Sequence, residues 1–374
     1  MDRREFSALL AAAAASPLVS RLSLAQSSPS PVSPAAAQLY ARALVLDCNS
    51  GPPYGGGKLP LSPALSQLVR DSGINVVKLS LGGINASFHD TFDEMGYYEC
   101  LFEEQPDLFM QVRVPADMQR AKQEGKLGII FSFESADMFE GKLDNIDLFR
   151  NHGVRVMQMS YNKTSAFAAG VMAPEAGGLT ALGREAVARM NKVGVTIDLS
   201  HANAQTTADA IAASAKPVVM THTGSAVVHP HPRNKSDAQL RAIADKGGVI
   251  GIYDLPYLTA SPRQPTIDDY IAHMEHVLKV AGDDHVGIGS DVGIAPFDTS
   301  AKGMEEFRKA EEERQKAGLA APEEDRPLYV EGMNTPRKLE LVAGRLLQRG
   351  HSAAVVEKIL GANFARVFRE TWAS

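Results

Sequence analysis

The stretch LGREAVARMNKVGVTIDLSH, residues 182–201, decides the fold. Apolar residues recur every three or four positions in its first part and predict an amphipathic helix over Leu182–Val193. Gly194 follows, where a left-handed helix end is expected. The β-branched and apolar run Thr196–Leu199 then predicts a buried strand, which ends at His201. A helix that leads directly into a buried strand is the repeating unit of an α/β protein.

The same alternation runs through the chain from Leu44 onward. Seven further strands are predicted, at Leu44–Asp47, Ile74–Leu79, Gly128–Phe133, Val154–Met159, Pro217–Thr221, Val249–Tyr253 and Val286–Gly289. Further helices are predicted at Asp237–Lys246, Asp268–Ala281, Pro336–Leu347 and Ala353–Phe368. Eight strands that each feed a helix are typical of an α/β (β/α)8 TIM barrel. An open, doubly wound parallel sheet is the alternative.

Composition excludes several classes of protein. The 374 residues include 44% hydrophobic residues and carry a net charge of −6, so no basic surface is expected and nucleic acid is not a predicted partner. Two cysteines cannot form a disulfide scaffold, and whether Cys48 and Cys100 pair stays open. The segment Lys302–Arg326, dense in Glu, Lys and Arg, predicts an exposed helix followed by a mobile loop.

The N-terminus is typical of an exported protein. Arg3 and Arg4 precede a short Ala-rich apolar run, which predicts a twin-arginine signal peptide over residues 1–25. A Ser- and Pro-rich disordered linker is predicted over 26–36, and a single barrel domain over 37–374. We therefore expect export by the twin-arginine machinery to a bacterial periplasm or to the outside of the cell.

Polar residues follow several of the predicted strands at their carboxyl ends, which is the rim where barrel enzymes carry out chemistry. They are Asp47, Asn49, Glu134, Tyr161, His201, His222 and Asp291. Two imidazoles and two carboxylates on one rim form a ligand set that Zn²⁺ accepts. The sequence therefore predicts a metal site built from Glu134, His201, His222 and Asp291.

Several of these residues lie in motifs that resemble the membrane (renal-type) dipeptidase family of zinc peptidases. The motifs are Gly177-Gly178-Leu179-Thr180, Gly183-Arg184-Glu185, Asp198-Leu199-Ser200-His201, Thr221-His222-Thr223, His231-Pro232-Arg233-Asn234 and Gly287-Ile288-Gly289-Ser290-Asp291. The resemblance spans roughly residues 41 to 370 and is most specific over 177–234. It implies a barrel of the metallo-dependent hydrolase type that cleaves dipeptides at a two-zinc centre.

The resemblance also implies roles for individual residues. Glu134 matches the carboxylate that bridges the two metals, and His201 and His222 match ligands of the second metal. Asp291 matches a ligand of the first metal that also transfers the proton. Arg233 matches the residue that holds the C-terminal carboxylate of the substrate, for which a planar guanidinium is suited.

The chain departs from the family pattern at the first metal. The family's first strand ends in a His-x-Asp pair of ligands, and the matching positions here are Asn49 and Gly51. This departure predicts one metal ion rather than two. Tyr161 stands where the family has a His that stabilises the oxyanion, and a Tyr hydroxyl can also donate a hydrogen bond there. Cys48 points away from the site and is predicted to pack in the core.

The leading prediction is thus a secreted metal-dependent hydrolase of dipeptides or small amides that uses one zinc ion. The alternative is a catalytically impaired binding or accessory protein that keeps the fold. A third possibility is an amidohydrolase acting on a non-peptide amide or lactone. A homodimer is possible. Five other histidines are predicted to lie outside the metal site. His89 is predicted to lie in a solvated loop, His273 and His276 at the surface of a helix, and His229 and His231 in a loop that shapes the approach to Arg233.

Overall fold

The computed structural model describes residues 32–372. The predicted signal peptide, residues 1–25, lies outside this range, and export stays a prediction. Helix α2 (Pro34–Arg42) begins inside the predicted linker, with Ser33 accepting a hydrogen bond from the Ala36 backbone as its N-cap. Ala36 is fully buried. The last three residues of the 26–36 segment therefore belong to the folded domain, because an N-cap and an apolar helix face hold them there.

All eight predicted strands are present, several of them shorter than predicted. They are β1 (Leu46–Asp47), β2 (Val76–Ser80), β4 (Leu127–Phe133), β5 (Val154–Met157), β6 (Thr196–Ile197), β7 (Met220–Thr223), β8 (Ile250–Ile252) and β9 (Val286–Ile288). A ninth strand, β3 (Phe109–Gln111), was not predicted and pairs only with β4. Its three residues are too few to show a hydrophobic period.

Parallel pairing closes the eight strands into a barrel. One sheet has the order β1-β2-β4-β5-β6, and the other has the order β7-β8-β9. The sheets meet at one seam through a parallel bridge between Asp198 and Val219. They meet again where the Cys48 N–H donates to the Ile288 carbonyl at 2.8 Å. The predicted barrel is confirmed, and the carboxyl ends of its strands share one rim.

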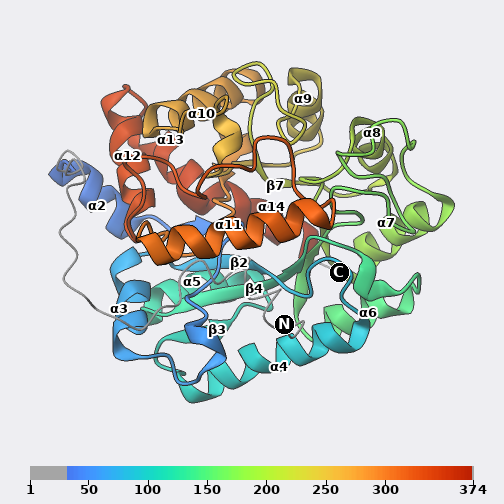
Figure 1. Cartoon of the computed structure of the whole chain (residues 1–374), viewed down its shortest axis with the longest axis horizontal. Coiled ribbons are helices and arrows are strands. Elements are labelled where there is room, and N and C mark those ends of the chain that lie inside the picture. Colours follow the sequence, from blue (N-terminus) through green and yellow to red (C-terminus); the bar gives the residue numbers. More distant parts are fainter. Residues whose placement is uncertain (1–31, 373–374) are drawn as a thin grey trace.

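Helices surround the strands (Figure 1). Besides α2 they are α3 (Pro63–Ser72), α4 (Phe88–Glu104), α5 (Pro115–Glu124), α6 (Asp144–Asn151), α7 (Ala181–Val193), α8 (Ala204–Ala213), α9 (Asp237–Asp245), α10 (Ile267–Ala281), α11 (Ala301–Lys316), α12 (Lys338–Gln348), α13 (Ala353–Glu357) and α14 (Asn363–Trp372). The predicted helix over 353–368 is thus divided in two, with one wide helical turn, η5 (Lys358–Ala362), between α13 and α14. No helix within residues 32–372 is long and apolar enough to cross a bilayer.

The segment quoted first folds as its pattern predicts. Thr180 caps α7 by accepting a hydrogen bond from the Gly183 backbone, and Gly194 ends the helix at φ +76°. A side chain at Gly194 would also come within 2.8 Å of the Trp372 carbonyl. Glycine is needed there for both reasons. The chain then enters β6, the strand that precedes His201.

The segment 302–326 departs from its prediction. Helix α11 is largely exposed, as predicted, and crosses the front of the molecule in Figure 1. The loop after α11, however, is held in place by hydrogen bonds of buried charged side chains. Glu324 accepts hydrogen bonds from Tyr257 Oη at 2.7 Å and from Arg314, and the Arg326 guanidinium donates to the Thr259 carbonyl at 2.9 Å. The many charged residues of this segment predicted a solvated loop, because the sequence does not show that these side chains pair with one another or with the barrel.

Candidate metal centre

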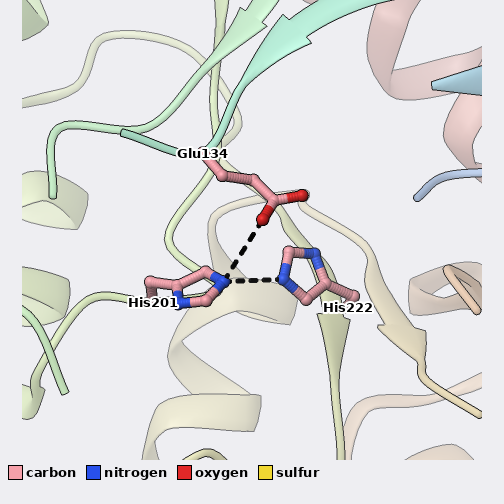
Figure 2. Close-up of side chains that lie close together, drawn as sticks. All are labelled: Glu134, His201 and His222. Carbon is pink, nitrogen blue, oxygen red and sulfur yellow. Dashed lines mark hydrogen bonds and ion pairs between the residues drawn. The ribbon is translucent and has the colours of Figure 1, made fainter. Parts of the chain in front are cut away.

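Three side chains from three strands converge on one point at the rim. Glu134 directly follows β4, His201 follows β6, and His222 lies in β7. His201 Nε2 lies 3.0 Å from His222 Nε2 and 3.6 Å from Glu134 Oε2. One potential ligand atom from each residue lies within 4.8 Å of the other two. Figure 2 shows the two imidazoles and the carboxylate pointing toward one another.

The hydrogen bonds of His201 determine which of its nitrogens is free. Its Nδ1 lies 2.8 Å from Asn162 Oδ1, while the Asn162 amide nitrogen donates to the Leu319 carbonyl. With the amide oriented this way, His201 Nδ1 carries the proton and donates it to the amide oxygen. Its Nε2 therefore presents a lone pair to the centre.

A similar chain of hydrogen bonds orients His222. The Thr221 hydroxyl lies 2.6 Å from Asp198 Oδ2 and 2.9 Å from His222 Nδ1. A hydroxyl so close to a carboxylate donates its only proton to it, so it accepts the proton of His222 Nδ1. The Nε2 of His222 therefore also presents a lone pair, and Asp198 fixes this tautomer through Thr221.

The convergence of these atoms fits a divalent cation. Burial lowers the pKa values of His201 and His222 well below their ordinary value, so both imidazoles are neutral. Burial would raise the pKa of Glu134, whereas the charges of Lys78 and Arg233 and a hydrogen bond from Asn49 lower it. Two lone pairs and a carboxylate thus face one another with no proton between them. Neutral imidazoles and a carboxylate are ligands that Zn²⁺ accepts.

Asp291 lies beside these three residues. Its Oδ2 is 3.9 Å from His222 Nε2, and its Oδ1 accepts a hydrogen bond from Asn49 Nδ2 at 2.5 Å. Burial, followed by the negative charge of Glu134, raises the pKa of Asp291 well above its ordinary value. Its backbone has a φ of +61°, uncommon for a residue other than glycine. Such backbone strain is concentrated at functional sites in proteins.

The other oxygen of Glu134 faces a different environment. Its Oε1 lies 3.9 Å from Nζ of Lys78, a fully buried side chain in the middle of β2. Asn49 follows β1 and is 4% exposed, and it directs its amide toward Asp291. Gly51 adds no side chain. Cys48 is buried in the core as predicted, and both Cys48 and the exposed Cys100 are free thiols.

Arg233 is also at the site. It is 2% exposed, and its Nη1 donates to the Ser200 carbonyl at 3.4 Å. Its positive charge lowers the pKa values of both Glu134 and Asp291, which favours their charged forms. The Arg233 backbone N–H donates to Nδ1 of His231, so that histidine shapes the loop as predicted.

Tyr161 covers the outer face of His201. The two rings stack with their centroids 3.9 Å apart. Burial raises the pKa of Tyr161 to about 12, so its hydroxyl keeps its proton near neutral pH. The positive charge of Arg314, in helix α11, acts on this pKa in the opposite direction. The side chain is therefore placed to donate a hydrogen bond at the rim.

The structure brings together all the residues predicted for the site, with Asp291 next to the three-residue cluster rather than within it. Two predictions for other histidines were wrong. His89 lies in helix α4 and not in a loop. His273 is fully buried, where it contacts the Leu258 carbonyl and the Ser225 backbone N–H. Sequence reasoning missed Asn162 and Lys78. The available signal for Lys78 was a charge inside the apolar strand VVKLS.

Comparisons with known proteins agree with this geometry. The model of the family "Membrane dipeptidase (Peptidase family M19)" matches residues 67–312. Dipeptidase tcpJ of Claviceps purpurea is 30% identical over 289 residues, which cover 76% of this chain but 61% of that protein. The chain thus spans less than two thirds of this relative.

Solved structures show the same fold. An amidohydrolase from Pseudomonas aeruginosa is 31% identical with a TM-score of 0.79, over 91% of this chain and 99% of that one. The probable dipeptidase PvdM from the same organism is 20% identical with a TM-score of 0.75, over 90% and 98% of the two chains. The resemblance found in the motifs is confirmed, and the chain belongs to the membrane dipeptidase family, peptidase family M19.

Proposed function

We propose that the chain is a metal-dependent hydrolase that cleaves dipeptides or small amides with one bound ion, and that this ion is zinc. The observation that carries the proposal is the convergence of two neutral Nε2 atoms and the Glu134 carboxylate beside Asp291. Three protein ligands leave a coordination position open for water or substrate. Family membership supports the reaction class.

In this proposal Glu134, His201 and His222 hold the ion, which when bound polarises the scissile carbonyl and acidifies a water molecule. Asp291 accepts the proton of the attacking water, for which its Oδ2 faces the centre. Asp291 then returns that proton to the leaving amine as the C–N bond breaks. The Asn49 amide holds the other oxygen of Asp291 in place.

Two further residues bind the substrate. Arg233 pairs with the C-terminal carboxylate of a dipeptide, and Tyr161 donates its hydroxyl proton in a hydrogen bond to the carbonyl oxygen as negative charge develops there. A pocket lined by Asp291, Phe297 and Tyr329, among others, adjoins the site and offers space for a substrate side chain.

Asp291→Asn tests the proposal, because asparagine keeps the shape and cannot accept the proton. We expect kcat for a small dipeptide panel to fall by about 10²–10⁴ while bound zinc per chain is unchanged. Steady-state kinetics and elemental analysis measure the two quantities. Retention of the wild-type kcat with the ion in place would exclude Asp291 as the base.

The accessory-protein alternative is favoured by one observation, the presence of Asn49 and Gly51 where the family pattern has ligands. The same assay separates it from the proposal. An unmutated protein that binds dipeptides and zinc but turns over neither dipeptides nor their amides is a binding protein. Turnover of amides and lactones with no turnover of dipeptides identifies a non-peptide amidohydrolase instead.

A further inference from the structure

We propose that Lys78 restricts the metal centre to one ion, because its ammonium supplies the positive charge on the side of Glu134 where a second divalent ion would lie. Lys78 is thus a positioning residue that acts through Glu134. The inference rests on the proposed function and concerns the number of ions that the centre accepts.

The environment of Lys78 is unusual for a lysine. It lies at the centre of β2 with Val76, Val77 and Leu79 around it in the chain, and its side chain is 0% exposed. Its Nζ has no hydrogen-bond partner among residues 32–372. A buried ammonium is costly unless neighbouring negative charge compensates it, so the carboxylates nearby explain its presence.

Two carboxylates lie at equal distance from this ammonium. Lys78 Nζ is 3.9 Å from Glu134 Oε1 and 3.9 Å from Asp198 Oδ2. Asp198 already accepts five hydrogen bonds, from the Gln158 amide and from the backbone and hydroxyl groups of Ser200 and Thr221. The carboxylate that depends on Lys78 for charge compensation is therefore Glu134.

A hydrogen-bond donor, the Asn49 amide, also lies beside Asp291 and Glu134. The Asn49 amide donates to Asp291 Oδ1 at 2.5 Å and lowers the pKa of Glu134. A cation bound between these two carboxylates would have to displace the amide and approach the Lys78 ammonium. The repulsion between a divalent ion and a fixed ammonium a few ångströms away, in a site shielded from water, strongly disfavours such binding.

The inference is tested by introducing the two missing ligand side chains into proteins with and without Lys78. Asn49→His with Gly51→Asp adds two ligand side chains; a Cβ at Gly51 would approach only the flexible end of Leu79, at 2.8 Å. We expect this double variant to bind one Co²⁺ or Zn²⁺ per chain, and the same variant with Lys78→Met to bind a second ion. Equilibrium dialysis with elemental analysis counts the ions, and the visible spectrum of Co²⁺ reports its ligands.

Three controls make the result specific. Lys78→Arg keeps the positive charge, so the double variant that carries it should still bind one ion. Lys78→Gln removes the charge and should have the same effect as Lys78→Met. It replaces Lys78→Met if the Met variant fails to fold. Lys78→Met alone should bind its single ion at least about tenfold more tightly, since a repulsive charge is removed.

The inference would be overturned if the double variant bound a second ion with Lys78 present. It would also be overturned if the double variant still bound a single ion after both Lys78→Met and Lys78→Gln. These outcomes are distinct from failure of the proposed function. If unmutated protein binds no ion, or binds one and hydrolyses nothing, the proposed function fails. The difference between ligand-restored variants with and without the lysine still reports on Lys78.

Discussion

The two oxygens of Glu134 face opposite kinds of chemistry. Oε2 faces His201 and His222, whose Nε2 atoms both present lone pairs, whereas Oε1 faces the Lys78 ammonium. The first side, which we call the histidine side, presents two neutral imidazoles. The second, the lysine side, holds a buried ammonium. One carboxylate thus separates a region suited to an external cation from a region that the chain itself has neutralised.

If the centre holds one ion as proposed, the number of metal ions depends on more than the number of ligands. Loss of the His-x-Asp pair would leave Glu134 and Asp291 as two adjacent carboxylates with unbalanced charge. Lys78 and the Asn49 amide lie where they reduce that imbalance. The following substitutions test how far the two sides are separate.

Removal of a ligand from the histidine side should have the largest effect. His222→Ala should release the ion and lower kcat/KM roughly 10³-fold or more, since a catalytic metal contributes several kcal/mol to transition-state stabilisation. Asn49→Ala on the lysine side is the matched control and should keep the ion. Metal analysis of both variants decides, and loss of the ion from Asn49→Ala alone would reverse the assignment of the two sides.

Arg233→Ala should have the next largest effect. We expect kcat/KM for free dipeptides to fall roughly 30- to 1000-fold, mainly because KM rises. This fall corresponds to a loss of about 2–4 kcal/mol of binding free energy, since the variant lacks a desolvated ion pair with the substrate carboxylate. Dipeptides with an amidated C-terminus should be affected little. Lys235→Met is a suitable control, since this buried lysine donates to the Ala202 carbonyl and should not alter the preference for free over amidated substrates. An equal loss on both substrates would place Arg233 in a structural role.

Tyr161→Phe should have the smallest effect. It removes one hydrogen bond to the developing oxyanion, worth about 1.4 kcal/mol, so kcat should fall about tenfold. The phenyl ring still stacks on His201, so the ion should be retained with unchanged affinity. Kinetics combined with a zinc titration separates the two roles. Weaker zinc binding with unchanged kcat would mean that Tyr161 serves the histidine side only by orienting His201.

The sequence predicts the barrel and the ligands because both depend on local patterns. Alternation of apolar runs and helices identifies eight strands, and His201, His222 and Asp291 stand at strand ends where the rim must be. The pairing of buried charges is not local, however. Glu324 and Arg314 appear as part of a solvated segment until the structure shows them paired, with Glu324 buried and Arg314 partly buried.

The same limit applies to the side chains around the ligands. Asn162 and Thr221 determine the tautomers of the two histidines, yet nothing in their neighbourhood in the chain indicates which nitrogen they contact. Lys78 is visible as a charge in an apolar strand, but its partner Glu134 lies 56 positions further along the sequence. Only the register between β2 and β4, which pairs Ser80 with Ser132, brings the ends of the two strands together.

Metal binding would have a further consequence, because the ligands of the site lie on both sides of the seam between the two sheets. At this seam, two backbone hydrogen bonds to and from Val219 and the Asp198–Val219 bridge connect β6 to the start of β7. Glu134 and His201 lie on one side of the seam, and His222 lies on the other. An ion held by all three would cross-link the halves of the barrel, so its binding free energy would add to the free energy of unfolding, by about 4 kcal/mol when free metal exceeds its dissociation constant roughly 1000-fold. Metal supply would then set the stability of the folded chain as well as its chemistry.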